Sequence, residues 1–514
     1  MSKRKIGRRA ARLGLLWLLA LATLATTACQ ADFRNPPRLA TATARAAATA
    51  TPTRAPLLLP APTATPDPTA ATPALAGAAA GAPAAPATSA VLNVWVNENS
   101  AAHAAVLQSM VEEFSAQTEI NVVLRLVAPQ LLPQIVETAV LSNTLPDVIL
   151  HPIEYSIGWA ARGILDPAAA DAAVDAIGRA TFDPDALDLL ELNGQTVAVP
   201  SDGYQQLLLY RADWFAERGL ATPNSYNSML AAAEALYRPE ALVTGFVIPT
   251  ESNLVTTHKA FEHLAAGNGC RLIDEQGEVR LLDPACRSAL DFYFNIVNRY
   301  SPPGVQTDTS ARNAFLEGRT GMIMASPAIL PDLATQGDLA ANTGILTRIR
   351  GAGPDAFPAN FGNVTTLGIT TRADRETAVA FARYWFETGY ARWLAVETER
   401  KTPLRWGTAA QPRLFIDAWG TQPLSGPNQS LEALYGPEIV AMLRADVAAS
   451  NRWGLREDQG ALVTLLYENL TFAVVLQEML SGYFNSSKTI FEAYVRVINL
   501  IPDYEFPVAP TPGP

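Results

Sequence analysis

The sequence predicts an α/β protein whose folded part contains more than one domain. The chain has 514 residues, of which 49% are hydrophobic, and this is enough to bury more than one core. From residue 91 onward, apolar β-type runs alternate with amphipathic helical patterns, which is typical of mainly parallel sheets with helices on both faces. Residues 193–220 contain two extended runs, a polar break between them and then a helix. This stretch predicts a first crossing between two lobes, with a ligand cleft beside it.

Residues 1–29 are expected to be a lipoprotein signal peptide. Six basic residues precede the apolar stretch 13–25, which is shorter than the roughly 20 residues that span a membrane. Thr26, Thr27 and Ala28 then precede Cys29, and this ending resembles the bacterial lipobox, although Thr26 stands where that motif usually has Leu. The resemblance implies that Cys29 is lipidated and that the chain is anchored to the cell membrane without spanning it. The alternative is an ordinary signal peptide that happens to contain a cysteine.

Residues 30–90 consist largely of Ala, Thr and Pro, with few residues to bury, and predict a disordered tether. Residues 506–514 predict a flexible tail. The formal charge of -11, from 38 basic and 49 acidic residues, argues against a nucleic-acid partner, because such proteins carry basic patches. Cys270 and Cys286 flank a predicted hairpin, and in an exported protein a disulfide between them is expected; two free buried thiols are the alternative.

Each helix or strand is predicted from the spacing of its apolar residues, and its ends are predicted from Gly and Pro. Residues 271–282 are expected to form a hairpin that turns at Gln276 and Gly277, and Asp283 is expected to cap the helix that follows. The other expected strands are 91–96, 122–127, 145–150, 196–199, 207–210, 243–248, 321–325 and 365–371; the expected helices are 103–118, a helix ending near 141, 154–162, 211–218, 256–266, 284–299 and 375–387, with mostly helix from 431 onward.

The ordered series of these pieces resembles the extracellular solute-binding proteins of family 1, the maltose-binding-protein-like receptors of bacterial ABC importers. The resemblance covers nearly all of 91–500 and rests on LNVWV (92–96), VEEFSAQTEINVVL (111–124), LPDVIL (145–150), WAARGILDP (159–167), ATPNSYNSMLAAAEAL (221–236), DPACRSALDFY (283–293), AFLEGRTGMIMASPAIL (314–330), TTLGIT (365–370), AVAFARYWFET (378–388) and KTPLRW (401–406). It implies a periplasmic-binding-protein-like fold in which two lobes close on a solute by bending at a hinge.

The resemblance also implies how the chain is divided. A solute-binding domain is expected at 91–505, with one lobe at about 91–199 and 371–430 and the other at about 200–365 and 435–500. The hinge crossings are then expected near Pro200, near Thr370 and within 426–437.

The function implied is capture of a small polar solute, most simply a sugar or oligosaccharide, and its delivery to the transmembrane subunits of an ABC importer. The receptor is expected to be a monomer without enzymatic activity, cofactor or metal. Ligand-binding positions transferred from the family lie in strand-to-helix loops, where aromatic faces, carboxylates and amides suit a sugar. They are Asn97, Glu98, Glu154, Tyr155, Asp202, Tyr204, Ser326, Phe361, Arg405 and Trp406, with Asn99, His151 and Asn360 as further candidates in the same loops.

Two other classes of function stay open. Any acidic protein offers carboxylate pairs, so a secreted glycoside hydrolase is an alternative, and a surface scaffold lipoprotein without a small ligand is another. A zinc site at His258, Glu262 and His263 is not expected, because on a helix His263 turns away from the face that the other two share. Trp159 and Trp385 lie on apolar helical faces and are expected in the core.

Overall fold

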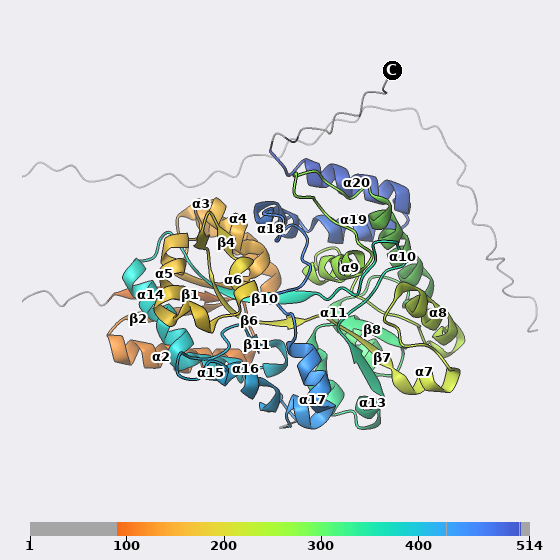
Figure 1. Ribbon diagram of the computed structural model, residues 1–514, viewed down its shortest axis with the longest axis horizontal. Helices are drawn as coiled ribbons and strands as arrows, with labels where there is room; N and C mark the ends of the chain where they lie inside the picture. Colours follow the sequence, from red (N-terminus) through yellow and green to blue (C-terminus); the bar gives the residue numbers. More distant parts are fainter. Residues whose placement is uncertain (1–89, 428, 503, 505–514) are drawn as a thin grey trace, which may run out of the picture. The chain divides into compact units, whose positions relative to one another are not determined.

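The computed structural model describes residues 90–427, 429–502 and 504, and these residues belong to one compact unit that begins at Ala84 (Figure 1). The predicted signal peptide with Cys29, the tether up to residue 89 and the tail 506–514 lie outside the described residues.

The strands form two main sheets. A six-stranded sheet has the order β11-β6-β10-β3-β1-β2, and a three-stranded sheet has the order β8-β7-β9. We call the six-stranded sheet with its helices the first lobe and the three-stranded sheet with its helices the second lobe. The strands are β1 Val91–Val96, β2 Asn121–Leu126, β3 Val148–Pro152, β4 Glu191–Leu192, β5 Gln195–Thr196, β6 Val199–Gln205, β7 Leu207–Arg211, β8 Met322–Ala325, β9 Thr343–Leu346, β10 Gly362–Ile369 and β11 Thr402–Pro403.

The two-lobed α/β class predicted from the sequence is confirmed. In the first lobe, β1 pairs in parallel with β2 and β3, whereas β10 and β11 return antiparallel. In the second lobe, β7 pairs antiparallel with β8 and β9, and among the described residues parallel pairing is limited to the isolated bridges of Ser225 with Arg350, Thr244 with Thr320 and Val247 with Ile323.

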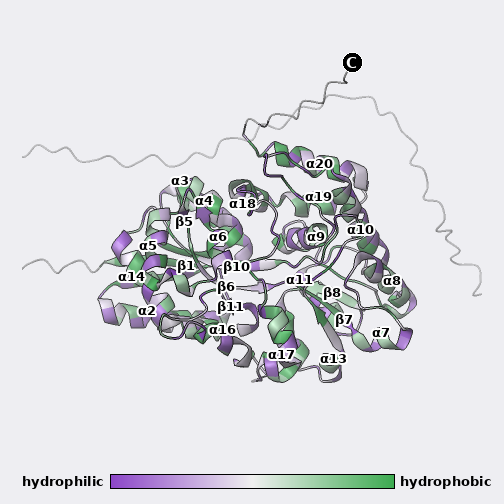
Figure 2. Ribbon diagram, in the orientation of Figure 1, coloured by the Kyte–Doolittle hydropathy of each residue, from purple (hydrophilic) through white to green (hydrophobic). Residues whose placement is uncertain are grey.

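Helices cover both faces of each sheet, and most carry hydrophilic and hydrophobic residues side by side, as α17 and α20 do in Figure 2. The helices are α2 Ala101–Thr118, α3 Leu132–Ser142, α4 Ser156–Ala161, α5 Pro167–Ile177, α6 Pro184–Asp188, α7 Ala212–Arg218, α8 Tyr226–Leu236, α9 Val255–Gly267, α10 Pro284–Tyr300, α11 Asp308–Leu316, α12 Leu330–Ala334, α13 Asp338–Ala341, α14 Arg375–Tyr384, α15 Tyr390–Leu394, α16 Leu414–Ala418, α17 Leu431–Arg444, α18 Gly460–Glu468, α19 Thr471–Leu480 and α20 Ser486–Ile498. Single turns are η1 Pro129–Leu131, η2 Ile153–Tyr155, η3 Arg179–Thr181, η4 Pro239–Ala241, η5 Pro327–Ile329, the π-turn η6 Trp385–Gly389, η7 Thr398–Arg400 and η8 Trp419–Thr421.

The alternation of side chains along the strands explains the two core layers of each lobe. In β1, Val94 packs into the layer with α2, α5 and α14, whereas its neighbour Trp95 packs into the layer with α3, α4 and α18. In β7, Leu208 faces the layer with α8, α9, α10, α19 and α20, and Leu207 and Leu209 face the layer with α11, α12 and α17. Trp159 and Trp385 are fully buried, which confirms their predicted core positions.

The chain passes between the lobes several times, since β11 belongs to the first sheet, α17 packs in the second lobe and α18 packs on the first. It leaves the first sheet through β6 and enters the second through β7, with only Gln206 between them, and it returns through β10 (Figure 1). Farther along, α18 packs on α4 of the first lobe, and α19 packs on α9 of the second. The two helices meet at a 50° bend where Leu470 has a φ of 51°, so this junction is a further crossing.

Three local predictions differ from the structure. The stretch 201–203, predicted as a break, lies inside β6, because β10 and β11 supply hydrogen-bonding partners on its two sides. Gly203 is required there, since a Cβ would lie 2.3 Å from the Asn363 carbonyl oxygen. The predicted strand 243–248 makes only isolated bridges, and the helix predicted at 375–387 changes to a π-turn at Trp385.

The predicted disulfide is present, linking Cys270 to Cys286 across a sequence separation of 16. The expected hairpin between them has one antiparallel bridge, from Ile273 to Val279. Asp283 occupies the N-cap of α10 as predicted, but its side chain pairs with Arg280 instead of capping the helix.

Among the described helices, none alone is long and apolar enough to cross a membrane; one bent pair, α18 with α19, meets that test by length and composition.

Candidate functional site

The candidate site is a cleft between the lobes that consists of two cavities with shared walls. The first, which we call the Glu154 cavity, has a volume of about 180 Å³ and lies where β1 and β3 end. The second, the Ser326 cavity, has a volume of about 310 Å³ and lies beside β8 and α11. Tyr204, Thr256 and Arg400 line both cavities, so we treat the two as one interlobe cleft.

Six of the predicted ligand-binding residues line this cleft. Asn97 and Glu98 follow β1, and Glu154 and Tyr155 follow β3, so the ends of two adjacent parallel strands bring them together. Tyr204 comes from β6, and Ser326 follows β8 in the second lobe. Burial raises the pKa of Tyr204 to about 12, so its phenol stays protonated and can donate a hydrogen bond to a ligand.

The other four predicted residues lie elsewhere. Asp202 is buried in the first lobe, where Trp393 and Ser201 donate hydrogen bonds to it. Phe361 packs under the Arg452 guanidinium, and Arg405 is buried against Thr181. Trp406 borders a separate cavity of about 340 Å³ with Asp183 and Arg444.

Two of the further candidates also have structural partners. His151 contacts Thr366 inside the first lobe, and the Asn360 amide donates to Gln205 and to the carbonyl of Asp446. Asn99 is exposed beyond β1.

The cleft residues that the sequence did not single out come from distant segments. They include Thr256 and Lys259 of α9, Asn363 of β10, Trp393 of α15 and Arg400 of η7. The sequence positions of two of these residues could have indicated a place in the cleft. Asn363 lies just before the predicted strand 365–371, and Arg400 directly precedes the KTPLRW segment.

Oxygen atoms that accept hydrogen bonds, but have no donor, converge on this cleft. Within the described part of the chain, no hydrogen bond reaches Asn97 Oδ1, Asn363 Oδ1, Gln206 Oε1 or either carboxylate oxygen of Glu154. All of these atoms are buried, and their residues line one or other of the two cavities. Because a buried acceptor without a donor is costly, the cleft is suited to a ligand that donates several hydrogen bonds.

The charges of the cleft are paired across the lobes. Lys259 Nζ of the second lobe lies 2.8 Å from Glu154 Oε1 of the first, and Arg452 Nη2 lies 3.9 Å from Glu154 Oε2. Burial alone would raise the pKa of Glu154, but Lys259 and Arg452 outweigh burial and lower it, so the side chain is a carboxylate.

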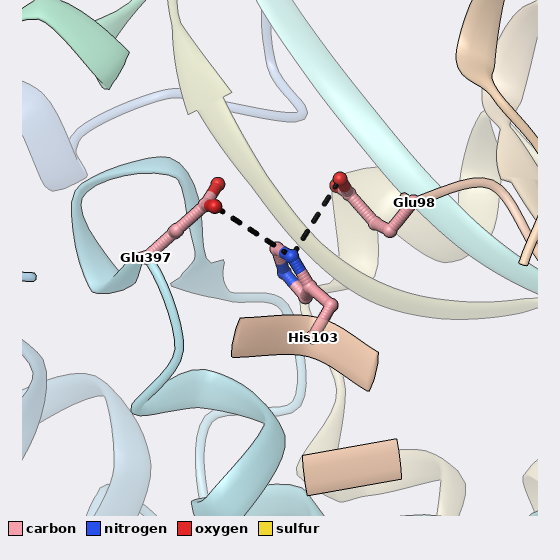
Figure 3. Close-up of side chains that lie close together, drawn as sticks. All are labelled: Glu98, His103 and Glu397. Atoms are coloured by element: carbon pink, nitrogen blue, oxygen red, sulfur yellow. Dashed lines mark ion pairs between the residues drawn. The ribbon is translucent and has the colours of Figure 1, made fainter. Parts of the chain in front are cut away.

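A second charged cluster lies in the first lobe and contributes Glu98 and Arg400 to the lining of the cleft; three of its side chains are shown in Figure 3. His103 Nδ1 lies 3.8 Å from Glu98 and 3.6 Å from Glu397, and Arg400 is ion-paired with both glutamates. Burial and the neighbouring Lys401 lower the pKa of His103 to about 3, and burial lowers that of Lys401 to about 8.

The three side chains in Figure 3 are spaced as metal ligands could be, since their ligand atoms lie within 4.8 Å of one another. However, the Arg400 guanidinium donates to both carboxylates, and Lys401 Nζ lies 2.7 Å from His103 Nε2. A divalent ion would be placed beside two cations, so we interpret the cluster as a buried ion-pair network and not as a metal centre.

A larger cavity, of about 770 Å³, lies outside the cleft, beside the disulfide. Asn268, Cys270 and Trp453 are among the residues that line it. Its charged residues, Arg271, Arg452, Arg456, Asp283, Asp355 and Glu457, carry both signs.

Two lobes joined by crossing strands, with a cleft of mixed polar and apolar lining between them, are the architecture of a ligand-binding protein. Residues 109–396 match the family of bacterial extracellular solute-binding proteins, and the chain belongs to this family. The family is one of extracellular solute-binding receptors, so membership places the protein outside the cytoplasm.

Curated relatives are similar over part of the chain. YcjN of Escherichia coli (strain K12), named as an ABC transporter periplasmic-binding protein, is 25% identical over 245 residues, which are 47% of this chain and 55% of YcjN. A mannitol-binding protein of Pseudomonas aeruginosa is 28% identical over 163 residues, which are 31% of this chain and 36% of that protein. The chain thus spans less than two thirds of the length of either relative.

The fold also matches solved structures. A solute-binding protein of an ABC transporter from Thermotoga lettingae, bound with α-D-tagatose, aligns with a TM-score of 0.64 at 18% identity, and the match covers 80% of this chain and 100% of that one.

Proposed function

We propose that this protein is the receptor of an ABC importer and captures a small polyhydroxylated solute, a sugar or a polyol, in the interlobe cleft. The observation that carries the proposal is the set of buried acceptor oxygens without donors on Asn97, Glu154, Gln206 and Asn363. Hydroxyl groups donate hydrogen bonds and also accept them, so a polyol can satisfy these oxygens and accept from the Tyr204 phenol in turn.

Aromatic rings in the cleft support the same ligand class. Tyr155, Tyr204 and Trp393 border the Glu154 cavity and offer apolar surface beside the acceptors. Sugars present C–H faces and hydroxyl edges, a combination that such mixed walls bind well. The printed names of the relatives point the same way, since one is a mannitol-binding protein and one was solved with tagatose.

The solute would be passed to the membrane subunits of the importer, as the family and the name of YcjN suggest. We expect one chain to be sufficient for binding, because both walls of the cleft come from the same chain. Size-exclusion chromatography with light scattering tests the expected monomer.

A lipid anchor at Cys29 is part of this proposal. Residues 1–29 have the order of basic, apolar and small residues before a cysteine that lipoprotein signals have. Replacing Cys29 with Ser is expected to move the protein from the membrane fraction to the soluble fraction. Equal membrane association of the two proteins would contradict the anchor.

A glycoside hydrolase would need one cleft carboxyl group with a raised pKa as its general acid. Glu154 has a lowered pKa and Glu98 is ion-paired with Arg400, but burial raises the pKa of Asp308, which lines the Ser326 cavity. The family is one of receptors, so we assign no catalytic step to Asp308 and expect no product when the purified protein is incubated with oligosaccharides; product that is lost in an Asp308→Asn variant would favour the hydrolase.

Thermal unfolding against a solute panel tests the proposed ligand class. Mannitol, tagatose and maltose represent polyhydroxylated solutes, and spermidine, glutamate and phosphate represent charged ones. A ligand that binds only the native state raises the unfolding midpoint in proportion to its concentration and affinity. We expect a rise with a polyhydroxylated solute; a rise with only charged solutes would contradict the proposal.

A further inference from the structure

The contact between Glu154 and Lys259 joins the two lobes inside the cleft. Glu154 lies in η2 at the end of β3 in the first lobe, and Lys259 lies in α9 of the second. The two side chains line the same cavity, and the residues are only 1% and 9% exposed. Their contact of 2.8 Å engages Oε1 of Glu154, whereas Arg452 lies 3.9 Å from Oε2, so Oε2 can accept a hydrogen bond from a ligand.

The surroundings of the pair leave it neutral overall. Arg452, the nearest other cation, is held by Glu262 through Nε at 3.2 Å, and Tyr467 and the Trp453 amide also donate to Glu262. Burial keeps the pKa of His258, beside Glu262, well below its usual value, so this histidine is uncharged. Within this group of four, the anions Glu154 and Glu262 are matched by the cations Lys259 and Arg452. Of the other charged residues that line the cleft, Glu98 is ion-paired with Arg400 and Arg312 with Asp332, and Thr256 donates a hydrogen bond to Asp308, whose pKa is raised by burial.

A neutral pair of this kind responds differently to ligands of different charge. Hydroxyl groups can donate to Oε2 of Glu154 without disturbing the pair. An ammonium group in the cavity is repelled by Lys259, a carboxylate is repelled by Glu154, and both ligands lose water on entry. Because unpaired buried charges are costly, discrimination against a charged analogue follows from the pair itself.

We propose that Glu154 and Lys259 form a charge filter, a specificity-determining pair that restricts the cleft to neutral solutes because each lobe supplies one of two cancelling charges. This inference rests on the proposed function. It goes beyond it by assigning the rejection of charged solutes to two named residues. It also predicts that removing either charge gives the cleft a preference for ligands of the same sign as the charge removed, not merely weaker binding.

The charge of the ligand that each variant prefers is set by the partner that remains. In Lys259→Met the carboxylate of Glu154 loses its nearest cation, so a ligand amine can replace the missing ammonium. In Glu154→Gln the ammonium of Lys259 loses its anion, so a ligand carboxylate can replace it. The double variant Glu154→Gln/Lys259→Met removes both charges, and Lys259→Arg keeps them.

The test uses three probes with one six-carbon skeleton: sorbitol, its amine analogue glucamine and its carboxylate analogue gluconate. Dissociation constants are measured by calorimetry at pH 7.5. The wild type and Lys259→Arg are expected to bind sorbitol about tenfold or more tightly than either charged probe, and the double variant is expected to discriminate less than the wild type, without a preference for either charge. Lys259→Met is expected to prefer glucamine, and Glu154→Gln is expected to prefer gluconate. Lys488→Met, the same change at an exposed lysine of α20, is the matched control and should keep the wild-type order.

The pair can also be tested without a ligand, by a double-mutant cycle of urea unfolding on the wild type, the two neutral single variants and the double variant. If the two charges stabilise each other, the double variant is more stable than the sum of the single effects predicts. Absence of coupling would overturn the pairing.

The possible failures are distinguishable. Sorbitol binding with the same order of probes in all variants would overturn the filter alone. Failure of all three probes to bind any variant would overturn both the filter and the polyhydroxylated ligand, whatever the unfolding cycle shows.

Discussion

The indole nitrogen of Trp393 lies 2.6 Å from a carboxylate oxygen of Asp202, in the interior of the first lobe. Asp202 is 1% exposed, and burial raises its pKa, although Lys401 and the hydrogen bonds from Ser201 and Trp393 favour the charged form. This contact joins β6, the first crossing strand, to α15. It gives Asp202 a role in stability, in place of the ligand-binding role expected from its position in the sequence.

Replacing Trp393 with Phe should therefore lower stability by leaving a buried carboxylate short of one donor, at a cost of about 1–3 kcal/mol. Urea unfolding measures the effect. Trp385→Phe is the matched control, because Trp385 is equally buried and its indole nitrogen has no hydrogen-bond partner among the described residues. Equal losses in the two variants would mean that the hydrogen bond to Asp202 contributes nothing measurable.

The acceptor Asn363 offers a test that separates binding from stability. Its Oδ1 atom has no donor in the described structure, so Asn363→Ala should weaken solute binding by about threefold to tenfold, with little change in the unfolding midpoint. Calorimetric titration and thermal unfolding of the same preparation give both numbers.

Asn360→Ala serves as the counterpart, three residues earlier. The Asn360 amide is bonded to Gln205 and Asp446, so this variant should lose stability through its core contacts. An Asn363→Ala protein that binds as well as the wild type would remove Asn363 from the site.

All four histidines are buried, and this predicts a specific loss of stability in acid. Burial lowers the pKa of His103 to about 3 and those of His151 and His263 to about 4, and that of His258 lies well below its usual value. The unfolded chain binds these protons below about pH 6.5, whereas the folded chain does not. The free energy of unfolding should thus fall as the pH decreases from about 6.5 to about 4, by about 1.4 kcal/mol per pH unit for each such histidine.

Urea unfolding between pH 5 and pH 8 measures this slope. A His151→Gln variant should show a slope smaller by about one proton, and should show no such difference above pH 7.5. The folded protein should also show no histidine protonation by NMR at pH 5.5, and an imidazole that titrates near pH 6.5 would contradict the prediction.

The disulfide should contribute to stability but not to binding. Cys270 and Cys286 close a short loop. Cys270 lines the 770 Å³ cavity, and neither cysteine lines the cleft. Replacing both with Ala should lower the free energy of unfolding by about 3 kcal/mol and leave solute affinity unchanged. A reducing agent should reproduce the loss in the wild type and have no effect on the variant; a change in affinity would link this region to the cleft.

Local patterns predicted most of the helices and strands. Leu107, Met110, Val111 and Phe114 follow the helical period, and all four are buried in α2 as their spacing requires. Propensity failed at 201–203, where Ser, Asp and Gly suggested a break, but pairing with β10 and β11 made a strand. Tertiary pairing of this kind comes from segments about 160 to 200 residues away and has no local signal.

The sequence predicted the cleft residues that follow strand ends and missed those that reach the cleft only through tertiary packing. Asn97 and Glu154 follow buried strands, so position alone brings them to the cleft. Lys259 and Arg400 reach it from helical segments of distant sequence, and the periodicity of those segments gives no indication of a cleft. Conversely, Phe361 and Arg405 lie near strand ends, but their side chains are buried, Phe361 against Arg452 and Arg405 against Thr181.

Calorimetric titration of mannitol, tagatose and maltose into the wild type and into an Asn97→Ala/Asn363→Ala variant tests the central claim most directly. The two asparagines supply acceptor oxygens without donors to the same cavity. We predict saturable one-site binding of at least one of these solutes to the wild type and about tenfold or greater weakening in the variant. No binding of any of them, or equal affinity of the two proteins for the solute that binds, would contradict the claim that the interlobe cleft captures a polyhydroxylated solute.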